Sequence, residues 1–458
     1  MAMWRNVLFC FCSVALTAAA GAQQWKAPTS MKKLANGLTV VISEDHSAPT
    51  FGLCITYGIG ARLEPVGRSG FAHLFEHMMF EGTPVAPKGV FDRVIEGGGG
   101  FNNGDTHYDY TEYIESAPIS ALEPILWLEA DRMKTLDFST KNLDNQRNVV
   151  EEEVRVNVFN QPYAQFFDLD MYQKAFDTYP NNHNAYGDFK DLEAANIGDV
   201  RHFYEQYYAP NNAVLAIVGD VKADEGFAFA EKHFAALASR PTPARPDVAE
   251  PTQKVERRIQ QTDKLASLPA LAIGYRVAPR QSRDAIVGAV AGELLHNGQA
   301  SRLYQALVKE KQVALSVDGG ADWPEGNAFD YNGPTLLTSF VVYPQSATEE
   351  KVVSAYDAVI ADLSKSGPSA KELERVIAKM RSDWYGQLEI PISRASALAH
   401  AVLFDGDFES VYTLPDELAQ VTPDEVRAFA AKYLVKPNRT IINRVPTPEE
   451  KATKQAGN

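Results

Sequence analysis

The chain has 458 residues, of which 45% are hydrophobic and 22% are charged, and its formal net charge is −15. This is the composition of a globular protein that is long enough for a packed core and for two or more domains. An acidic surface of this kind disfavours binding to nucleic acid or to anionic lipid, so neither is expected as a partner.

The first 22 residues differ from the rest. Arg5 precedes an apolar run at residues 7–20, and Ala20-Gly21-Ala22 closes the segment. A positive end, a short apolar stretch and small residues predict a secretory signal peptide that is removed after Ala22. The run is short for a membrane anchor, and a mitochondrial presequence would carry several arginines. We therefore expect a periplasmic protein whose mature form keeps one cysteine, Cys54, and so has no internal disulfide.

Apolar periodicity predicts the main elements of the first half. β-Strands are expected at residues 38–42 and 51–57, the first of them entered through the turn at Asn36-Gly37. Helices are expected at residues 70–80, 121–133 and 142–156, and residues 113–116 are expected to end a strand.

The composition changes near the middle of the chain, where residues 239–254 are rich in proline and polar side chains. This segment predicts a linker between an N-terminal domain at residues 23–238 and a C-terminal domain at residues 255–445, followed by a polar tail at 446–458. In both halves a helix with aromatic residues leads through Pro-Asn, at Pro210 and at Pro437, into a strand. The pattern favours a duplicated domain, the alternative being a chance recurrence of common residues.

The most specific motif is His73-Leu74-Phe75-Glu76-His77. On a helix, His73 and His77 project from one face and can bind one zinc ion. Glu76 reaches the same side and can take a proton from zinc-bound water, which is the inverted zincin arrangement. Two surface histidines on a solvated helix are the alternative, although the apolar residues at 78–80 indicate a buried neighbourhood.

A catalytic zinc ion needs a third protein ligand. The acidic run at residues 151–153 is flanked by valines, so part of its helix is expected to be buried. Helical geometry places Glu153 on one side with Val149, Val150 and Gln146, which favours Glu153 as the acid that points inward. Periodicity alone leaves Glu152 as a competitor.

Residues 70–83 resemble the signature of the pitrilysin/insulinase metallopeptidases, in the short two-domain form of mitochondrial processing peptidase and its bacterial relatives. The resemblance extends over nearly all of the mature chain. It implies an α+β fold of two homologous domains, each a mainly antiparallel sheet packed with helices. Residues 147–153 match the family's distal helix, which assigns the third zinc ligand to Glu153. Asn103 and Gly104 match an edge strand that holds the substrate main chain by strand addition.

Two departures from the family pattern have consequences. Gln146 stands where the family has a glutamate, which bears on zinc affinity because residues around the ligands tune a metal site. The family's arginine and tyrosine, which polarise the scissile carbonyl, fall on Val308 and Leu315, and neither can stabilise an oxyanion. Arg302 and Tyr304 match a different part of the motif and are expected to be structural.

The resemblance therefore implies a zinc-dependent endopeptidase subunit that acts on peptides or unfolded polypeptides. One Zn²⁺ per chain is expected on His73, His77 and Glu153, with Glu76 as the base. A homologous subunit without the zinc motif would supply the arginine and tyrosine in a heterodimer. The alternatives are a self-sufficient homodimeric peptidase and a non-catalytic scaffold subunit of the same fold.

Overall fold

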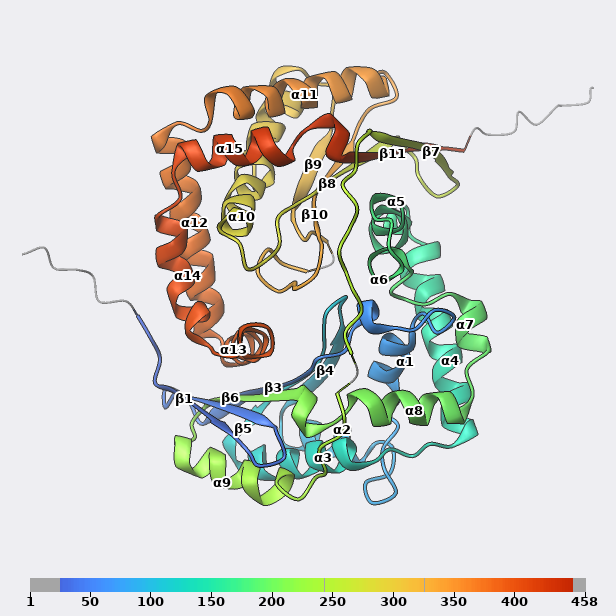
Figure 1. Ribbon diagram of the computed structural model, residues 1–458, viewed down its shortest axis with the longest axis vertical. Coiled ribbons are helices and arrows are strands. Elements are labelled where there is room, and N and C mark those ends of the chain that lie inside the picture. The colour runs from blue at the N-terminus through green and yellow to red at the C-terminus, as the bar shows by residue number, and fades with distance from the viewer. Residues whose placement is uncertain (1–24, 243, 325, 448–458) are drawn as a thin grey trace, which may run out of the picture.

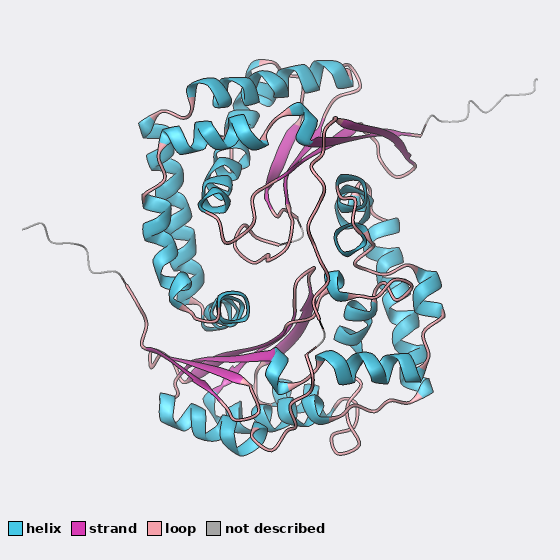
Figure 2. Ribbon diagram, in the orientation of Figure 1, coloured by secondary structure: helices cyan, strands magenta, loops and turns pink. Residues whose placement is uncertain are grey.

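The structure, a computed structural model, describes residues 25–447 except 243 and 325. The expected signal peptide and nearly all of the expected polar tail lie outside the described residues. Two mixed β-sheets face each other across the molecule, and helices cover their outer faces and close two sides (Figures 1 and 2). Within residues 25–447, no helix combines the length and apolar character needed to span a membrane.

The first sheet has the strand order β1-β2-β6-β3-β5-β4. Its strands are β1 (Thr29–Lys33), β2 (Thr39–Glu44), β3 (Thr50–Tyr57), β4 (Phe101–Thr106), β5 (Thr111–Pro118) and β6 (Ala213–Gly219). Only the β2–β6 pair is parallel. Both faces of β6 are covered, which explains its continuous apolar sequence. Among the described residues, β4 pairs with β5 alone, and its other edge is open.

The second sheet repeats this topology in the order β7-β11-β8-β10-β9. Its strands are β7 (Arg257–Asp263), β8 (Ala270–Arg276), β9 (Ser316–Ala321), β10 (Leu336–Val342) and β11 (Arg439–Pro446). Within the described part of the chain, strand β1 has no counterpart in the second sheet, and β2 corresponds to β7. In each half the last strand pairs in parallel with this strand, β6 with β2 and β11 with β7. This order and the family comparison given below confirm the predicted α+β fold of two homologous domains.

The helices that precede these last strands are α8 (Ile197–Tyr207) and α15 (Pro423–Tyr433). Each leads into a 3₁₀ turn, at Pro210–Asn212 and Lys436–Asn438, and then into the strand. The two Pro-Asn pairs of the sequence therefore occupy matching places in the two halves.

The other helices of the first half include the three predicted ones. They are α1 (Phe71–Met78), α2 (Val90–Gly97), α3 (Leu122–Lys134), α4 (Thr140–Val154), α5 (Tyr172–Ala175), α6 (Tyr179–Asn182), α7 (Phe189–Glu193) and α9 (Ala223–Phe234). Helix α4 ends two residues before the predicted boundary, because the chain continues as a π-helical turn at Arg155–Phe159.

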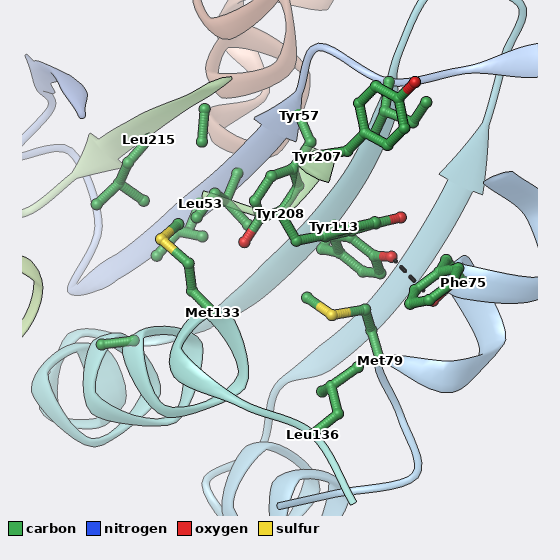
Figure 3. Close-up of a cluster of buried hydrophobic side chains, with 14 of the residues drawn as sticks. Leu53, Tyr57, Phe75, Met79, Tyr113, Met133, Leu136, Tyr207, Tyr208 and Leu215 are labelled. Atoms are coloured by element: carbon green, nitrogen blue, oxygen red, sulfur yellow. Dashed lines mark hydrogen bonds between the residues drawn. The ribbon is translucent and has the colours of Figure 1, made fainter. Parts of the chain in front are cut away.

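The first core fills the space between one face of the first sheet and α1, α3, α8 and α9. Figure 3 shows Tyr57 and Tyr113 of the sheet packed with Phe75 of α1, Met133 of α3 and Tyr208. The second half has its own core beneath α10 (Arg283–His296), α11 (Glu349–Ser366), α12 (Ala370–Glu389) and α14 (Glu409–Ala419).

Each half also covers the sheet of the other half. Helix α13 (Pro391–Asp405) lies on the second face of the first sheet, where its Leu398 packs with Cys54 and Ala216. At Gly52 the two backbones approach so closely that a Cβ atom would stand 2.3 Å from the amide nitrogen of Ile392. In return, residues 166–176 of the first half pack against β8, β10 and β11.

Candidate active site

The N-terminus of α1 is held by a buried carboxylate. Glu64 accepts hydrogen bonds from the backbone N–H groups of Gly70 (2.9 Å) and Ala72 (2.7 Å), and His183 Nε2 lies 2.9 Å from the same carboxylate. His183 Nδ1 lies 2.7 Å from the carbonyl oxygen of Tyr179, so both ring nitrogens face oxygen acceptors, an arrangement that favours the imidazolium form. An anion at this helix end is also favoured by the helix dipole.

Burial governs the ionisation of this pair. It raises the pKa of Glu64, although the hydrogen bonds that the carboxylate accepts oppose the rise. Burial alone would lower the pKa of His183, but the hydrogen bond to Glu64, the Glu64 charge and backbone hydrogen bonds together raise it.

Two glycines let another loop approach the start of α1. Gly70 has φ of 80° and Gly187 has φ of 93°, and a Cβ atom on Gly70 would stand 2.5 Å from the Cα atom of Gly187. Only glycine tolerates both this backbone conformation and this distance. The approach brings the ring of Tyr186 edge-on to His73, with the ring centroids 5.3 Å apart.

The side chains of α1 divide between two faces. Phe71, Leu74, Phe75 and Met78 are buried in the first core, and the Phe75 ring stacks on Phe203 at 5.0 Å. The Tyr113 hydroxyl donates to the Phe75 carbonyl at 3.4 Å, the contact dashed in Figure 3. This packing leaves His73, Glu76 and His77 on the opposite face of the helix, which lies against α4.

Three potential metal ligands meet between α1 and α4. His73 Nε2 lies 3.3 Å from His77 Nε2, while the Glu153 carboxylate lies 3.1 Å from His77 and 3.6 Å from His73. In a tetrahedral zinc site with bonds of 2.0–2.1 Å, ligand atoms are separated by about 3.3 Å. The three donors therefore fit a zinc ion. Glu152 points away, with 66% of its side chain exposed and Arg155 at 3.5 Å.

The histidines and carboxylates of this cluster shift one another's pKa values. Hydrogen bonds from His73 and His77 hold the pKa of Glu153 well below its usual range. Burial alone would lower the pKa of His73, but the hydrogen bond to Glu153 and the nearby charge of Glu76 raise it. Burial raises the pKa of Glu76, and a carboxylate with a raised pKa is a stronger proton acceptor.

The open edge strand β4 lies against α1. A Cβ atom on Gly104 would stand 2.9 Å from Glu76 Cγ and 3.2 Å from the ring of Phe80, so only a glycine leaves Glu76 its present position. Asn103 is exposed and faces the other side of the sheet, since it precedes Gly104 in the strand. The structure thus places Gly104 beside the motif and leaves the outer edge of the strand free.

Gln146 does not contact the three ligand atoms directly. It lies on α4, and its side-chain amide donates to the buried carboxylate of Glu81, which also pairs with Lys88. The negative charge beside this part of α4 therefore sits on Glu81. Glu81 was not singled out from the sequence, because an acid next to an apolar run is usually exposed and only the fold buries this one.

Comparison with known proteins identifies the family. The insulinase family (peptidase family M16) matches residues 39–185, and the peptidase M16 inactive domain matches residues 194–380. The chain belongs to the M16 peptidase family. The zinc protease PqqE of Helicobacter pylori is 27% identical over 383 residues, which is 82% of this chain and 84% of that protein.

Similarities to three other proteins agree with this result. A probable mitochondrial-processing peptidase subunit beta of Arabidopsis thaliana is 26% identical over 259 residues, 56% of this chain and 48% of that one. The crystal structure of a protease from Helicobacter pylori has a TM-score of 0.85 at 24% identity and covers 92% of this chain and 100% of its own. The periplasmic protease PqqL from Escherichia coli has a TM-score of 0.73 at 19% identity, with coverages of 91% and 47%.

In this M16 chain, the two positions expected to correspond to the family's arginine and tyrosine lie in the second half. Val308 belongs to a π-helical turn, Tyr304–Glu310, whose neighbours are α11 and β9, and Leu315 is 51% exposed. Arg302 is held by two carboxylates, Glu372 at 2.8 Å and Asp362 at 3.1 Å. Arg302 therefore fastens helices of the second half.

Proposed function

We propose that the chain is a zinc-dependent endopeptidase subunit that hydrolyses peptides or unfolded polypeptides. The observation that carries the proposal is the convergence of His73, His77 and Glu153 at zinc-ligand separations, with the half-buried Glu76 beside them. Its membership of a peptidase family and its similarity to a protein named zinc protease support it.

His73, His77 and Glu153 would hold one zinc ion. Zinc bound by such a set lowers the pKa of a coordinated water toward neutrality and polarises a carbonyl group. Glu76 accepts the proton of the attacking water and delivers it to the leaving amine, a task for which its burial and raised pKa suit it. Glu64 and His183 keep the helix that carries these residues in place.

The substrate would bind as an added strand along the open edge of β4. Strand addition joins main chain to main chain, so it requires an extended peptide. Gly104 keeps the space between this strand and Glu76 narrow, and Asn103 would contact the substrate main chain. A folded protein offers no free strand of this kind, and for this reason we assign peptides and unfolded chains as substrates.

A homologous subunit would complete the site in a heterodimer. The motivating observation is the pair of apolar side chains, Val308 and Leu315, at the positions that stabilise the oxyanion in the family. The partner would lack the zinc motif and carry the arginine and tyrosine. Purified, zinc-loaded chain that cleaves peptides at a rate unchanged by a co-expressed partner would refute this part of the proposal.

We also assign the protein to the periplasm. The features of residues 1–22 support this location, and a structural relative, PqqL, is described as a periplasmic protease.

The function is tested with Glu76→Gln. This variant should keep its zinc, because Glu76 is not a ligand, and lose peptidase activity by at least about a hundredfold, the usual contribution of a general base. Glu152→Gln is the matched control, since Glu152 is an exposed acid next to the ligand on α4. His73→Ala should lose the metal by elemental analysis. Full activity in Glu76→Gln would overturn the assignment of the base.

A further inference from the structure

A second group of metal-ligating side chains lies where the two halves meet. It consists of Cys54 on β3, Glu112 on β5 and His400 on α13, and all three are buried. Cys54 Sγ and His400 Nε2 each lie 3.1 Å from the same oxygen, Glu112 Oε2. The proposed peptidase mechanism uses none of the three.

We infer that Cys54, Glu112 and His400 form a structural site for a zinc-like divalent cation. Their donor atoms, one sulfur, one nitrogen and one oxygen, all lie within 4.8 Å of one another. Sulfur, imidazole nitrogen and carboxylate oxygen are the donors that zinc takes in proteins, and tetrahedral bonding separates them by about 3.3–3.7 Å. Small side-chain shifts are therefore enough to bring the three donors around one ion.

The surroundings of His400 match those of a metal-bound histidine. Its other ring nitrogen, Nδ1, lies 3.6 Å from Asp330 Oδ1, and its ring packs on Tyr110 with the centroids 4.1 Å apart. Ligating histidines commonly direct their second nitrogen to a carboxylate, which sets the tautomer and leaves the first nitrogen to the metal. The Asp330 carboxylate and the Tyr110 ring thus orient Nε2 toward Cys54 and Glu112.

Two of the three proposed ligands are accessible to an ion. Glu112 and His400 line a cavity of about 320 Å³, together with Ser396, Asp330 and Gln387. This cavity gives a path of entry and room for a water molecule as a fourth ligand, two features that a metal site needs. Three protein ligands from β3, β5 and α13 would join the first sheet to a helix of the second half, so the ion would fasten the two halves together.

Without metal, His400 and Glu112 form an ion pair, and the Cys54 thiol donates a hydrogen bond to the Glu112 carboxylate. A divalent cation replaces the thiol proton and the imidazolium proton, so its binding releases protons and strengthens as the pH rises. Absorption of bound cobalt separates the two arrangements, because a cobalt–thiolate bond adds charge-transfer bands in the near ultraviolet. His73, His77 and Glu153 contain no sulfur and cannot give such bands.

The experiment uses the full chain with Cys10→Ser and Cys12→Ser, which leaves Cys54 as its one thiol. After loading with cobalt(II) and removal of excess metal, we expect thiolate bands and about two cobalt ions per chain, one of them at the proposed catalytic site. Adding Cys54→Ser should abolish the bands and leave about one ion. Bands that are absent from the parent protein, or that persist after Cys54→Ser, would refute the site.

A second measurement separates this site from the catalytic one. With His73→Ala and His77→Ala in the same background, the chain should retain about one zinc ion by elemental analysis, and adding Cys54→Ser should remove it. Zinc-free protein after the two histidine substitutions, with its circular dichroism unchanged, would contradict the proposal. This metal measurement does not depend on the proposed peptidase function, so full activity in Glu76→Gln would refute that function and leave the second metal site untouched.

Discussion

Replacing Glu64 by glutamine tests how the catalytic helix is held. The Glu64 carboxylate accepts hydrogen bonds from two backbone N–H groups at the start of α1 and from His183. Glutamine keeps one acceptor oxygen but turns an NH₂ group toward a donor. It also leaves the buried His183 imidazolium without its counter-charge, while His183 Nδ1 stays on the Tyr179 carbonyl.

The cost follows from these contacts. Removing one partner of a buried ion pair costs about 3–5 kcal/mol, and losing a helix N-cap costs about 1 kcal/mol. The two overlap, because one carboxylate serves both, so we expect a loss of about 3–5 kcal/mol in the free energy of unfolding. Zinc affinity should fall too, since His73 directly follows the capped Ala72.

Urea unfolding of zinc-free protein at pH 7 measures the loss in the free energy of unfolding. Competition with a chelator measures the loss of zinc affinity. The double variant Glu64→Gln/His183→Gln is the control, because it removes the unpaired charge. It should be more stable than the sum of the two single losses predicts, by more than about 1 kcal/mol. A loss below about 1 kcal/mol in Glu64→Gln, or strict additivity in the cycle, would refute this account of the helix.

Two further predictions concern pH and the edge strand. In metal-free protein, burial opposes the charge on His400, but the carboxylates of Glu112 and Asp330 together raise its pKa to about 10. Burial would raise the pKa of Glu112, but His400 and the hydrogen bond from Cys54 lower it to about 2. In the unfolded chain the pKa values of His400 and Glu112 are about 6.5 and about 4.3. The ion pair therefore stabilises the fold fully between about pH 4.3 and about pH 6.5, and this contribution is lost as the pH rises toward about 10 or drops toward about 2. Thermal melts across pH should show a smaller loss of melting temperature above about pH 6.5 in the control variant His400→Gln than in the parent protein. Gly104→Ala should lower turnover roughly ten- to a hundredfold by displacing Glu76, with zinc content unchanged. Gly97→Ala, where a Cβ atom meets nothing within 4 Å, should be neutral in the same peptidase assay.

Local sequence patterns predicted much of the fold. The apolar run at residues 38–42 lies in β2 except for Leu38, the run at 51–57 lies in β3, and the helical periodicities correspond to α1, α3 and α4. The matching ends of the two halves indicated a duplicated domain, which the strand orders and the family comparison confirm. These features depend on neighbours within a few turns or strand residues, and sequence periodicity reports such contacts directly.

The remaining parts of the site depend on contacts between distant segments. Neighbouring helical residues point about 100° apart, so periodicity could not decide between Glu152 and Glu153, whereas the packing of α4 on α1 turns Glu153 toward the histidines. Glu64 and His183 stand 119 positions apart, and Glu112 and His400 stand 288 apart. No spacing rule links such residues, and only the assembled halves show that they meet.

The exchange of covering segments between the halves has a consequence for how the chain folds. Helix α13 shields the sheet of the first half, and residues 166–176 shield the sheet of the second. Each half expressed by itself would leave an apolar sheet face in water, and such faces drive aggregation. The chain is thus expected to unfold in one cooperative step, and a protease that cuts the proline-rich connection at 239–254 would leave two fragments still bound to each other.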